Sequence, residues 1–539
     1  MFQWLDGIRS ARKKPRILDY EQLDAAFEPM ALKTVSLPFA SPDIIANADS
    51  ALEKIFRLPQ GGLVDFSKGL DWSINFESAN NSWQLWLHSL PFIQDLVVAY
   101  ANTTHGPYLA QAIFLLSDYL DWLNNPVASV VAWKDEHAIT NRSCVLVHLL
   151  KKHDEGAIAL PAALVSAISQ SLNQNAEWLF DDSHYVQNNH GTMADKALLQ
   201  IALSPGFLTT ERSRIWILRA LARISMMARL TFDSDGACTE NSSAYHLLNV
   251  YLFASILDFM RSHSLYADPA LEQIVAKAES VSPYFVRTDG SLAMIGDSGI
   301  RPTHWVDNQL LASKTGTKTF PGAGFFISKG ADLYVTAKCG GSTFSHRHFD
   351  DTSITVSYKN RDLIVDPGHY NYDSRDPIFR SIRSFRSHSG IFTNDCDRNA
   401  WPNPADPHAT GSMTAIEGQN GVLMRSNLAD NASIRRIVCV HGEAISIEDQ
   451  VIADTTVRWR QQFVVHPRCK MTIDGKVVLI EHDGVQCRIE SVADSAYIVE
   501  LGETKYSEKF MQVEPTQMVY FTGVSSHVKI FTRITVSES

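Results

Sequence analysis

Residues 344–350 of this 539-residue chain read Phe-Ser-His-Arg-His-Phe-Asp, within a region of short β-branched and aromatic runs. Two histidines at positions i and i+2 of a regular strand point to one face of a sheet, and Arg347 between them points to the other. For His346 and His348 to have separate roles, the strand must therefore end, bend or bulge here. The stretch predicts a β-rich domain with an interrupted strand.

The same region continues with Val-Asp-Pro-Gly at residues 365–368 and Arg-Ser-His at residues 386–388. Asp366 and His388 lie in segments that are typical of strands or strand ends. Together with His348 they offer two imidazoles and a carboxylate, a set that suits a zinc-like ion. The alternative interpretation is that these are surface histidines of a β-domain.

Short strands are predicted along the whole C-terminal part of the chain. They cover residues 325–328, 333–336, 353–358, 362–365, 437–440, 444–447, 459–465, 477–480 and 528–531. Turn sequences such as Ser-Lys-Gly and Asp-Gly-Lys separate several of them. Many short strands of this kind are typical of an antiparallel β-sandwich.

The preceding part of the chain has helical periodicity instead. Helices are predicted at residues 43–56, 108–123, 139–153, 161–180, 191–203, 212–230, 242–263 and 269–281. Helices of this length with short loops, and with no strand predicted between them, pair as antiparallel hairpins. We therefore expect an α+β multidomain protein: an N-terminal arm (1–40), an incomplete (α/α) toroid (41–315) and a C-terminal antiparallel β-sandwich (316–539).

The composition excludes several classes of protein. A net charge of -11 argues against a nucleic-acid partner, although a locally basic cleft for an acidic sugar polymer remains compatible with it. No run of about 18 apolar residues predicts a membrane span. The seven cysteines form no CxxC pair, which favours reduced, mostly buried thiols. The N-terminus has no secretory signal pattern. The expected location is cytoplasmic if the sequence is full length, and periplasmic or secreted if a leader has been removed.

Two stretches of the helical part carry candidate functional residues. Residues 187–191 read Gln-Asn-Asn-His-Gly at a predicted helix start, where an Asn is also a plausible N-cap. Residues 240–246 read Glu-Asn-Ser-Ser-Ala-Tyr-His and open a long helix. The Tyr245 hydroxyl would lie on an early turn and could face a cleft, although an ordinary buried tyrosine is the alternative.

Taken together, these motifs resemble those of the heparinase II/III-like polysaccharide lyases, from about residue 72 to residue 440. The markers are the Asn-His pair at 189–190, the Glu-x-Ser-x-x-Tyr-His stretch at 240–246, Gly-Asp-Ser at 296–298, and the segments 345–350, 365–372 and 379–388. His388 is followed by Ser-Gly-Ile, where the family usually has Asn-Thr-Val. The resemblance implies a toroid joined to a β-sandwich, and cleavage of uronate-containing polysaccharides by β-elimination.

The resemblance also implies roles for particular residues. Asn189 and His190 would neutralise the uronate carboxylate, so that charge developing after loss of the C5 proton is stabilised. Tyr245 would be the general acid and often also the base, and His346 the base or an assisting group.

Further residues are implied as ligands. The predicted substrate-binding residues are Glu240, His246, Arg347, Arg383 and Arg386, and the arginines suit carboxylates or sulfates. The predicted metal ligands are His348, Asp366 and His388, around a structural divalent ion, most simply zinc.

The sequence leaves the substrate open. The arginines favour a glycosaminoglycan of the hyaluronan, chondroitin or heparan type, and alginate or a bacterial exopolysaccharide is the alternative. A toroid glycoside hydrolase using carboxylates such as Asp235, Glu240 or Asp297, and a non-catalytic polysaccharide-binding protein, are the competing functions. Neither a nucleic acid nor a membrane is an expected partner, and a homo-oligomer is an open alternative.

Overall fold

A computed structural model describes residues 30–39, 41–59, 62–74, 82–125, 127–299, 311–343, 345–394, 411–429 and 431–538. These residues divide into two compact units. The helical unit comprises described residues up to 228 together with 254–272, and the strand-rich unit comprises 229–253 and 273–538. Helices α9, α10 and α11 thus have residues in both units, and the domain boundary predicted at residue 315 stays a prediction. Of the predicted N-terminal arm, residues 1–29 and 40 lie outside the described residues, and residues 30–39 have no helix or strand.

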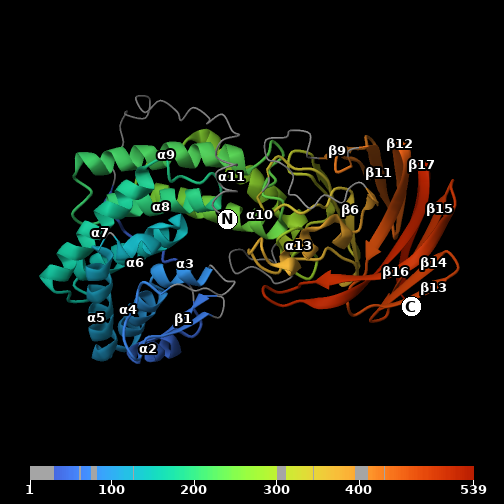
Figure 1. Ribbon diagram of the computed structural model, residues 1–539. Helices are drawn as coiled ribbons and strands as arrows, with labels where there is room; N and C mark the ends of the chain where they lie inside the picture. The colour runs from blue at the N-terminus through green and yellow to red at the C-terminus, as the bar shows by residue number, and fades with distance from the viewer. Residues whose placement is uncertain are drawn as a thin grey trace. The chain divides into compact units, whose positions relative to one another are not determined.

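The helical part follows the predicted order of amphipathic helices (Figure 1). Its helices are α2 (Ile44–Leu52), α3 (Ser82–His88), α4 (Pro91–Thr103), α5 (Gly106–Leu123), η3 (Ala128–Trp133), α6 (Glu136–Asp154), α7 (Ala162–Phe180), α8 (Asn189–Leu203), α9 (Glu211–Thr231), α10 (Ser243–Ser262) and α11 (Pro269–Val281). Their apolar faces are buried, as the periodicity predicts. Within the described parts of the chain, no helix has the length and apolar character needed to cross a membrane.

The first predicted helix is too long, and the prediction of no strand in the helical part is wrong. Helix α2 ends at Leu52, and Lys54 has a left-handed backbone with φ of 59°. Strand β1 (Ile55–Leu58) then pairs antiparallel with β2 (Gly62–Asp65). A left-handed residue ends a helix, and the alternating residues of β1 bury Phe56 and Leu58.

The strand-rich unit contains two antiparallel sheets. The smaller has the order β3-β4-β5-β6-β7, and the larger has the order β13-β14-β15-β17-β12-β11-β10-β9, with β16 on β17 and β8 on β12. The strands are β3 (Gly316–Phe320), β4 (Phe325–Lys329), β5 (Leu333–Lys338), β6 (Ser353–Tyr358), β7 (Arg361–Ile364), β8 (Ile391–Thr393), β9 (Ser412–Ala415), β10 (Gly421–Ser426), β11 (Ala432–His441), β12 (Ala444–Val464), β13 (Lys470–Asp474), β14 (Val477–His482), β15 (Val485–Ala493), β16 (Tyr497–Tyr506) and β17 (Glu514–Glu538). Short helices among the described residues of this unit include η4 (Ser282–Phe285), α13 (Pro377–Arg383) and η5 (Phe385–Ser387).

One hydrophobic core lies between the two sheets. Val335 and Val356 of the smaller sheet belong to the same buried cluster as Ile447, Trp459 and Val519 of the larger sheet. The alternation of buried and exposed residues along the strands supplies this core. The expected antiparallel β-sandwich is therefore present, after an incomplete toroid.

Strand β12 corrects the predicted strand list, because the runs 444–447 and 459–465 belong to one continuous strand. The intervening residues include Asp449, which is fully buried and accepts hydrogen bonds from Arg436 at 2.7 Å through both oxygens. Arg436 also donates to the carbonyl oxygens of Thr352 and Ser389, at 2.8 and 3.0 Å. This buried ion pair fixes the backbone beside two segments of the candidate site.

Candidate active site and metal centre

The loop between β5 and β6 carries His346 and His348, so the predicted interruption of the strand is present. His346 has a left-handed backbone with φ of 55°. Asn241 holds the loop, because its Nδ2 donates to the carbonyl oxygens of Thr343 and Ser345, each at 3.0 Å. His346 remains partly exposed, whereas His348 is buried. The break gives the two imidazoles different surroundings, as their separate predicted roles require.

Asp297 is the buried carboxylate that joins these two histidines. Its Oδ2 lies 2.9 Å from Nδ1 of His346, and its Oδ1 lies 2.9 Å from Nε2 of His348. Arg383, from α13, donates to Oδ2 as well. Burial by itself raises the pKa of Asp297, but Arg383, then His369 and the two bonded imidazoles, hold it well below its usual range. Asp297 is therefore a fixed negative charge.

Asp297 also controls the tautomer of His346. A carboxylate bonded to Nδ1 places the imidazole proton there and leaves the lone pair on Nε2. Oε2 of the buried residue Glu240 lies 3.6 Å from that Nε2. The arrangement suits His346 for accepting a proton from a molecule bound at its exposed edge.

The neighbouring residue Ser298 connects this carboxylate to the start of helix α10. Its hydroxyl accepts the backbone N–H of Ala244 at 3.1 Å and exchanges hydrogen bonds with the hydroxyls of Ser242 and Ser243, at 2.8 and 2.9 Å. These contacts fix the first turn of α10, on which Tyr245 lies.

The Tyr245 ring stacks on His346, with ring centroids 3.5 Å apart and an angle of 18° between the planes. Its hydroxyl lies 2.7 Å from that of Tyr372. Burial, followed by the contact with Tyr372, raises the pKa of Tyr245 well above its ordinary value, so this phenol is neutral near pH 7. A neutral phenol next to an oriented imidazole is an acid–base pair.

The edge of this pair is formed by aromatic residues that are partly exposed. The rings of His369 and Tyr372 are 4.4 Å apart, and Phe510 lies 5.3 Å from His369. Burial lowers the pKa of His369 to about 4, so its ring is neutral near pH 7. Aromatic faces at the edge of a site suit the apolar faces of sugar rings.

Asn189 and His190 lie in the helical unit, on the first turn of α8. The N-cap of this helix is Asn188, whose Oδ1 accepts the backbone N–H of His190 at 2.9 Å. Asn189 is therefore not the cap, although it is buried. The half-exposed imidazole of His190 is held by Glu136, with 3.0 Å between Nδ1 and Oε1. Their predicted role as a carboxylate clamp stays a prediction.

The predicted substrate-binding residues have very different surroundings. His246 is fully buried, its Nδ1 accepts the N–H of Cys238 at 3.2 Å, and its Nε2 lies 3.1 Å from the Ser282 hydroxyl. Successive helical residues point about 100° apart. For this reason His246 packs into the core while Tyr245 stays at the edge, and the geometry supports a structural role for His246.

The arginines also differ from expectation. Arg347 is buried with its guanidinium 3.5 Å from Asp351, and Arg383 is buried against Asp297. Both stabilise buried carboxylates, so the geometry does not favour either as a substrate ligand. Arg386 is exposed and lies over the Phe385 ring, with 5.5 Å between the guanidinium and the centroid.

Two residues of the site lie in the sequence motifs, but the lyase interpretation assigned neither of them a role. Asp297 belongs to the Gly-Asp-Ser stretch, and Tyr372 ends the segment after Val-Asp-Pro-Gly. A positive φ at Gly296, where an added Cβ would lie 2.3 Å from the carbonyl oxygen of Asn241, marks the first stretch as a close backbone contact. In the sequence, Gly296 directly before Asp297 was the feature that could have indicated this close backbone contact.

The predicted metal ligands His348, Asp366 and His388 come together in the strand-rich unit. Their ligand atoms lie within 4.8 Å of one another, and all three residues are buried. Nδ1 of His348 and Nε2 of His388 have no hydrogen-bond partner among the described residues. Such buried nitrogens are costly unless a partner satisfies them, so the donors fit a divalent ion.

Both imidazoles of this metal centre are oriented by carboxylates. His348 is bonded through Nε2 to Asp297, and Nδ1 of His388 lies 3.1 Å from Oδ2 of Asp366. Asp350 is a buried acidic neighbour of both histidines, and burial raises the pKa of its carboxyl group. An ion here would hold the His346 loop through His348.

Comparisons with known proteins agree with this architecture. The family model described as Heparinase II/III N-terminus matches residues 32–323, and the one described as Heparinase II/III-like, C-terminal, matches residues 312–534. A search of curated proteins finds no match.

Solved structures share the fold. Heparinase III has a TM-score of 0.80 at 17% identity, with 96% of this chain and 89% of that chain covered. The heparan sulfate lyase HepC of Pedobacter heparinus has a TM-score of 0.66 at 17% identity, with 96% of this chain and 87% of that chain covered. A chondroitin AC lyase mutant of Streptomyces coelicolor A3 has a TM-score of 0.59 at 9% identity, with 94% of this chain and 81% of that chain covered.

Replacing His388 by Ala should lower the divalent metal content of the purified protein and lower its unfolding midpoint in urea, because one of the three ligands is removed. Elemental analysis and urea titration measure the two quantities. His527→Ala, at an exposed histidine of the same unit, is the matched control and should change neither. Equal metal content in His388→Ala and the parent would contradict the assignment of His388.

Proposed function

Because the chain belongs to the heparinase II/III-like family of polysaccharide lyases, we propose that it cleaves a uronate-containing glycosaminoglycan by β-elimination. The observation that carries the proposal is the stacked pair of Tyr245 and His346, with His346 bonded to the buried carboxylate of Asp297. A phenol and an imidazole of fixed tautomer are the acid and base that such an elimination needs.

In the proposed reaction, Nε2 of His346 accepts the C5 proton of the uronate. The electron pair of the C5–H bond forms the C4=C5 double bond, and the C4–O4 bond breaks. Tyr245 donates its proton to the departing O4, and proton transfer through solvent restores both side chains. Asn189 and His190 are the proposed donors to the uronate carboxylate, where each donor would contribute about 3–4 kcal/mol of transition-state stabilisation.

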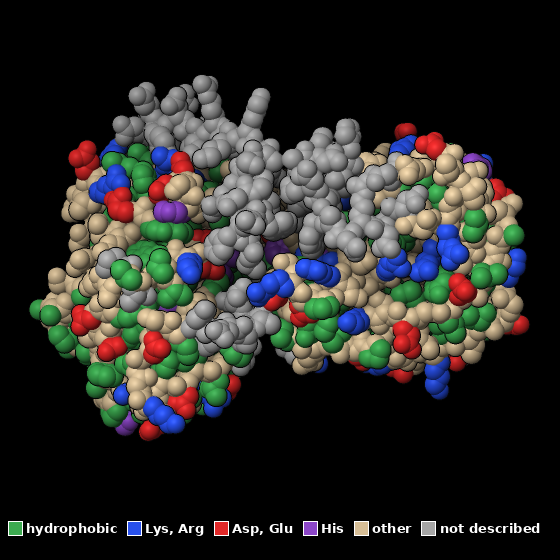
Figure 2. Space-filling model, in the orientation of Figure 1, with side chains coloured by type: hydrophobic (Ala, Val, Ile, Leu, Met, Phe, Trp, Pro, Cys, Tyr) green, Lys and Arg blue, Asp and Glu red, His purple; other side chains and the backbone are tan. Residues whose placement is uncertain are grey.

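The glycosaminoglycan class is proposed from two lines of support. Structures with this fold include a heparan sulfate lyase and a chondroitin AC lyase. On the face drawn in Figure 2, Lys and Arg side chains lie together on parts of the strand-rich unit, despite the net negative charge of the chain. Exposed Arg386 is the proposed contact for a substrate carboxylate or sulfate.

The proposed metal is a zinc ion with a structural role. Two imidazoles and one carboxylate are typical zinc ligands, and the ion would fix the orientation of His348 beneath the loop of His346. The residues of the acid–base pair are separate from the ligands, so the proposed reaction needs no step at the metal.

A panel of hyaluronan, chondroitin, heparan sulfate and alginate tests the function. We expect ultraviolet absorbance from the new C4=C5 double bond with at least one glycosaminoglycan. New reducing ends without that absorbance would identify a hydrolase, and polymer binding without either signal would identify a binding protein. Absorbance with alginate alone would overturn the substrate class but keep the lyase.

Replacing Tyr245 by Phe should lower kcat about 10²–10⁴-fold, because the proton donor for O4 is lost while the ring stack is kept. The rate of ultraviolet absorbance increase is the measurement. Tyr251→Phe lies on the same helix at an exposed position and should keep full activity. Full activity of Tyr245→Phe would remove Tyr245 from the mechanism.

The pH profile separates the two roles that the sequence left open for Tyr245. A general acid is lost as pH rises through its pKa, and the raised pKa of Tyr245 moves that loss above about pH 10. Ionisation of Tyr245 should therefore cause no change in kcat/KM between about pH 8 and about pH 10. If the Tyr245 phenolate were the base, kcat/KM would rise about tenfold per pH unit over this interval, and that rise would disappear in Tyr245→Phe.

A further inference from the structure

A second group of metal-binding side chains lies in the strand-rich unit, apart from the residues discussed above. His466 and Cys469 lie in the turn between β12 and β13, and His482 is the last residue of β14. One ligand atom of each lies within 4.8 Å of the other two. The two histidines are only 2% and 4% exposed, and Cys469 is partly buried.

The two imidazoles leave buried nitrogen atoms without a hydrogen-bond partner. Nε2 of His466 and Nε2 of His482 both lack one among the residues that the structure describes. The nearest acidic group to Nε2 of His482 is the exposed carboxylate of Asp483, at 3.7 Å. A buried polar atom without a partner is unfavourable, and two such nitrogens beside a thiol fit one shared metal ion.

Hydrogen bonds to a single backbone carbonyl group orient His482 and Cys469, as hydrogen bonds commonly orient the ligands of a metal ion. The backbone carbonyl oxygen of Asp362 accepts a hydrogen bond from Nδ1 of His482 at 2.8 Å and from Sγ of Cys469 at 3.4 Å. The first bond places the His482 proton on Nδ1 and leaves the Nε2 lone pair available.

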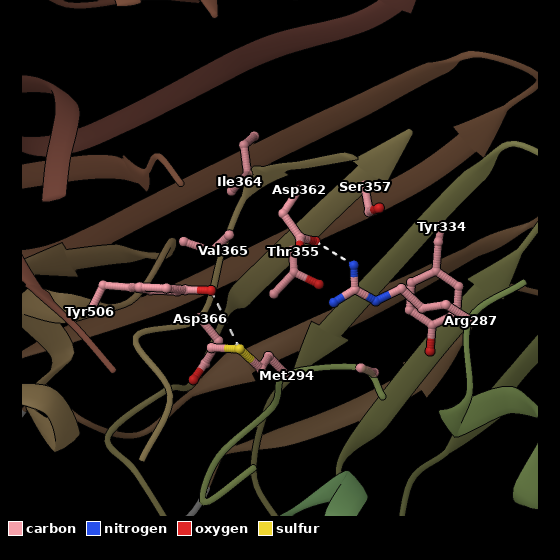
Figure 3. Close-up of a pocket in the computed structure, with 11 residues that line it drawn as sticks. Arg287, Met294, Tyr334, Thr355, Ser357, Asp362, Ile364, Val365, Asp366 and Tyr506 are labelled. Carbon is pink, nitrogen blue, oxygen red and sulfur yellow. Dashed lines mark hydrogen bonds and ion pairs between the residues drawn. The ribbon is translucent and has the colours of Figure 1, made fainter. Parts of the chain in front are cut away.

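The residue that accepts these bonds is itself held in place. The carboxylate of Asp362 accepts a hydrogen bond from Arg287 at 2.6 Å, across the small cavity drawn in Figure 3. Nδ1 of His466 accepts the backbone N–H of Arg468 at 3.2 Å, and Nε2 has no partner among the described residues. Nε2 becomes available as a metal ligand when the ring proton moves to Nδ1.

We propose that His466, Cys469 and His482 bind one Zn²⁺ ion, as a structural site distinct from the centre of His348, Asp366 and His388. A thiolate with two imidazoles is a ligand set typical of zinc and unsuited to calcium or magnesium, which take oxygen ligands. Bonds of about 2.0 Å to nitrogen and 2.3 Å to sulfur separate tetrahedral ligands by about 3.3–3.6 Å, so small side-chain rotations close the site. The Cys469 thiol gives its proton to solvent on binding, and water or the Asp483 carboxylate completes the tetrahedron.

The position of the site gives the ion a structural role. His466 directly follows Val465, which forms a β-bridge with Ile364 at the end of β7. The backbone N–H of His466 donates to the carbonyl oxygen of Leu363 at 3.2 Å. His482 ends β14 of the larger sheet. The ion would therefore fix the turn between β12 and β13 against the end of β14, beside β7 of the smaller sheet.

Cobalt substitution tests the proposal, because a thiolate ligand gives Co²⁺ a near-ultraviolet charge-transfer band that nitrogen and oxygen ligands do not give. The full chain, stripped with a chelator and reloaded with Co²⁺, should show this band together with the visible bands of a tetrahedral ion. Cys469→Ser should lose the charge-transfer band and one equivalent of zinc. His388→Ala should keep the band, since the other centre has no sulfur ligand.

Cys439→Ser is the matched control, at a buried cysteine of the same unit, and should leave the band unchanged. If Cys469→Ser does not fold, alkylation of the parent chain gives the answer. Zn²⁺ should slow the reaction of Cys469 with iodoacetamide by about tenfold or more, as read by peptide mass spectrometry, because a metal-bound thiolate is masked. No charge-transfer band on Co²⁺ loading, with equal Cys469 alkylation with and without Zn²⁺, would overturn the proposal.

Discussion

The candidate active site depends on one buried charge, the carboxylate of Asp297. Removing a carboxylate from water costs several kcal/mol unless donors surround it. Here a guanidinium from α13 and two imidazoles from the β5–β6 loop serve as those donors. Since the donors come from two separate segments, the charge also fixes the relative positions of the loop and α13.

The two oxygens of Asp297 serve different parts of the protein. Oδ1 is bonded to His348, which belongs to the buried metal centre, and Oδ2 is bonded to His346, which is partly exposed beside Tyr245. The following serine fixes the first turn of the helix that carries Tyr245. One Asp-Ser pair thus connects the proposed base, the proposed acid and the proposed metal ligands within a single unit.

The sequence predicted the fold class because helical and strand periodicities are separated along the chain. It also predicted His348, Asp366 and His388 as one ligand set, and the structure brings these three side chains together. Burial is what the sequence does not reveal. Arg347 and Arg383 were predicted to bind a polyanion, and in the structure each pairs with a buried carboxylate. The continuity of β12 was not predicted, because a charged residue such as Asp449 interrupts the apolar pattern of a strand. In the structure Arg436 pairs with this buried carboxylate.

The roles of Asp297 and Tyr372 depend on contacts between distant segments. Asp297 lies 49 residues before His346 in sequence, and Tyr372 lies 127 residues after Tyr245. No local pattern predicts such pairs. The separate predictions for Asn189 and His190 rest on the resemblance, and their local geometry in α8 is compatible with a donor role.

Steady-state kinetics of Asp297→Asn test the central claim, that a fixed negative charge keeps the lone pair of His346 directed at the substrate. The substitution preserves the size of the side chain but removes the charge that sets the tautomer. We predict that kcat for formation of the unsaturated product falls about 10²–10⁴-fold with little change in KM, in a variant whose circular dichroism spectrum matches the parent's. An unchanged kcat in the folded variant would contradict it.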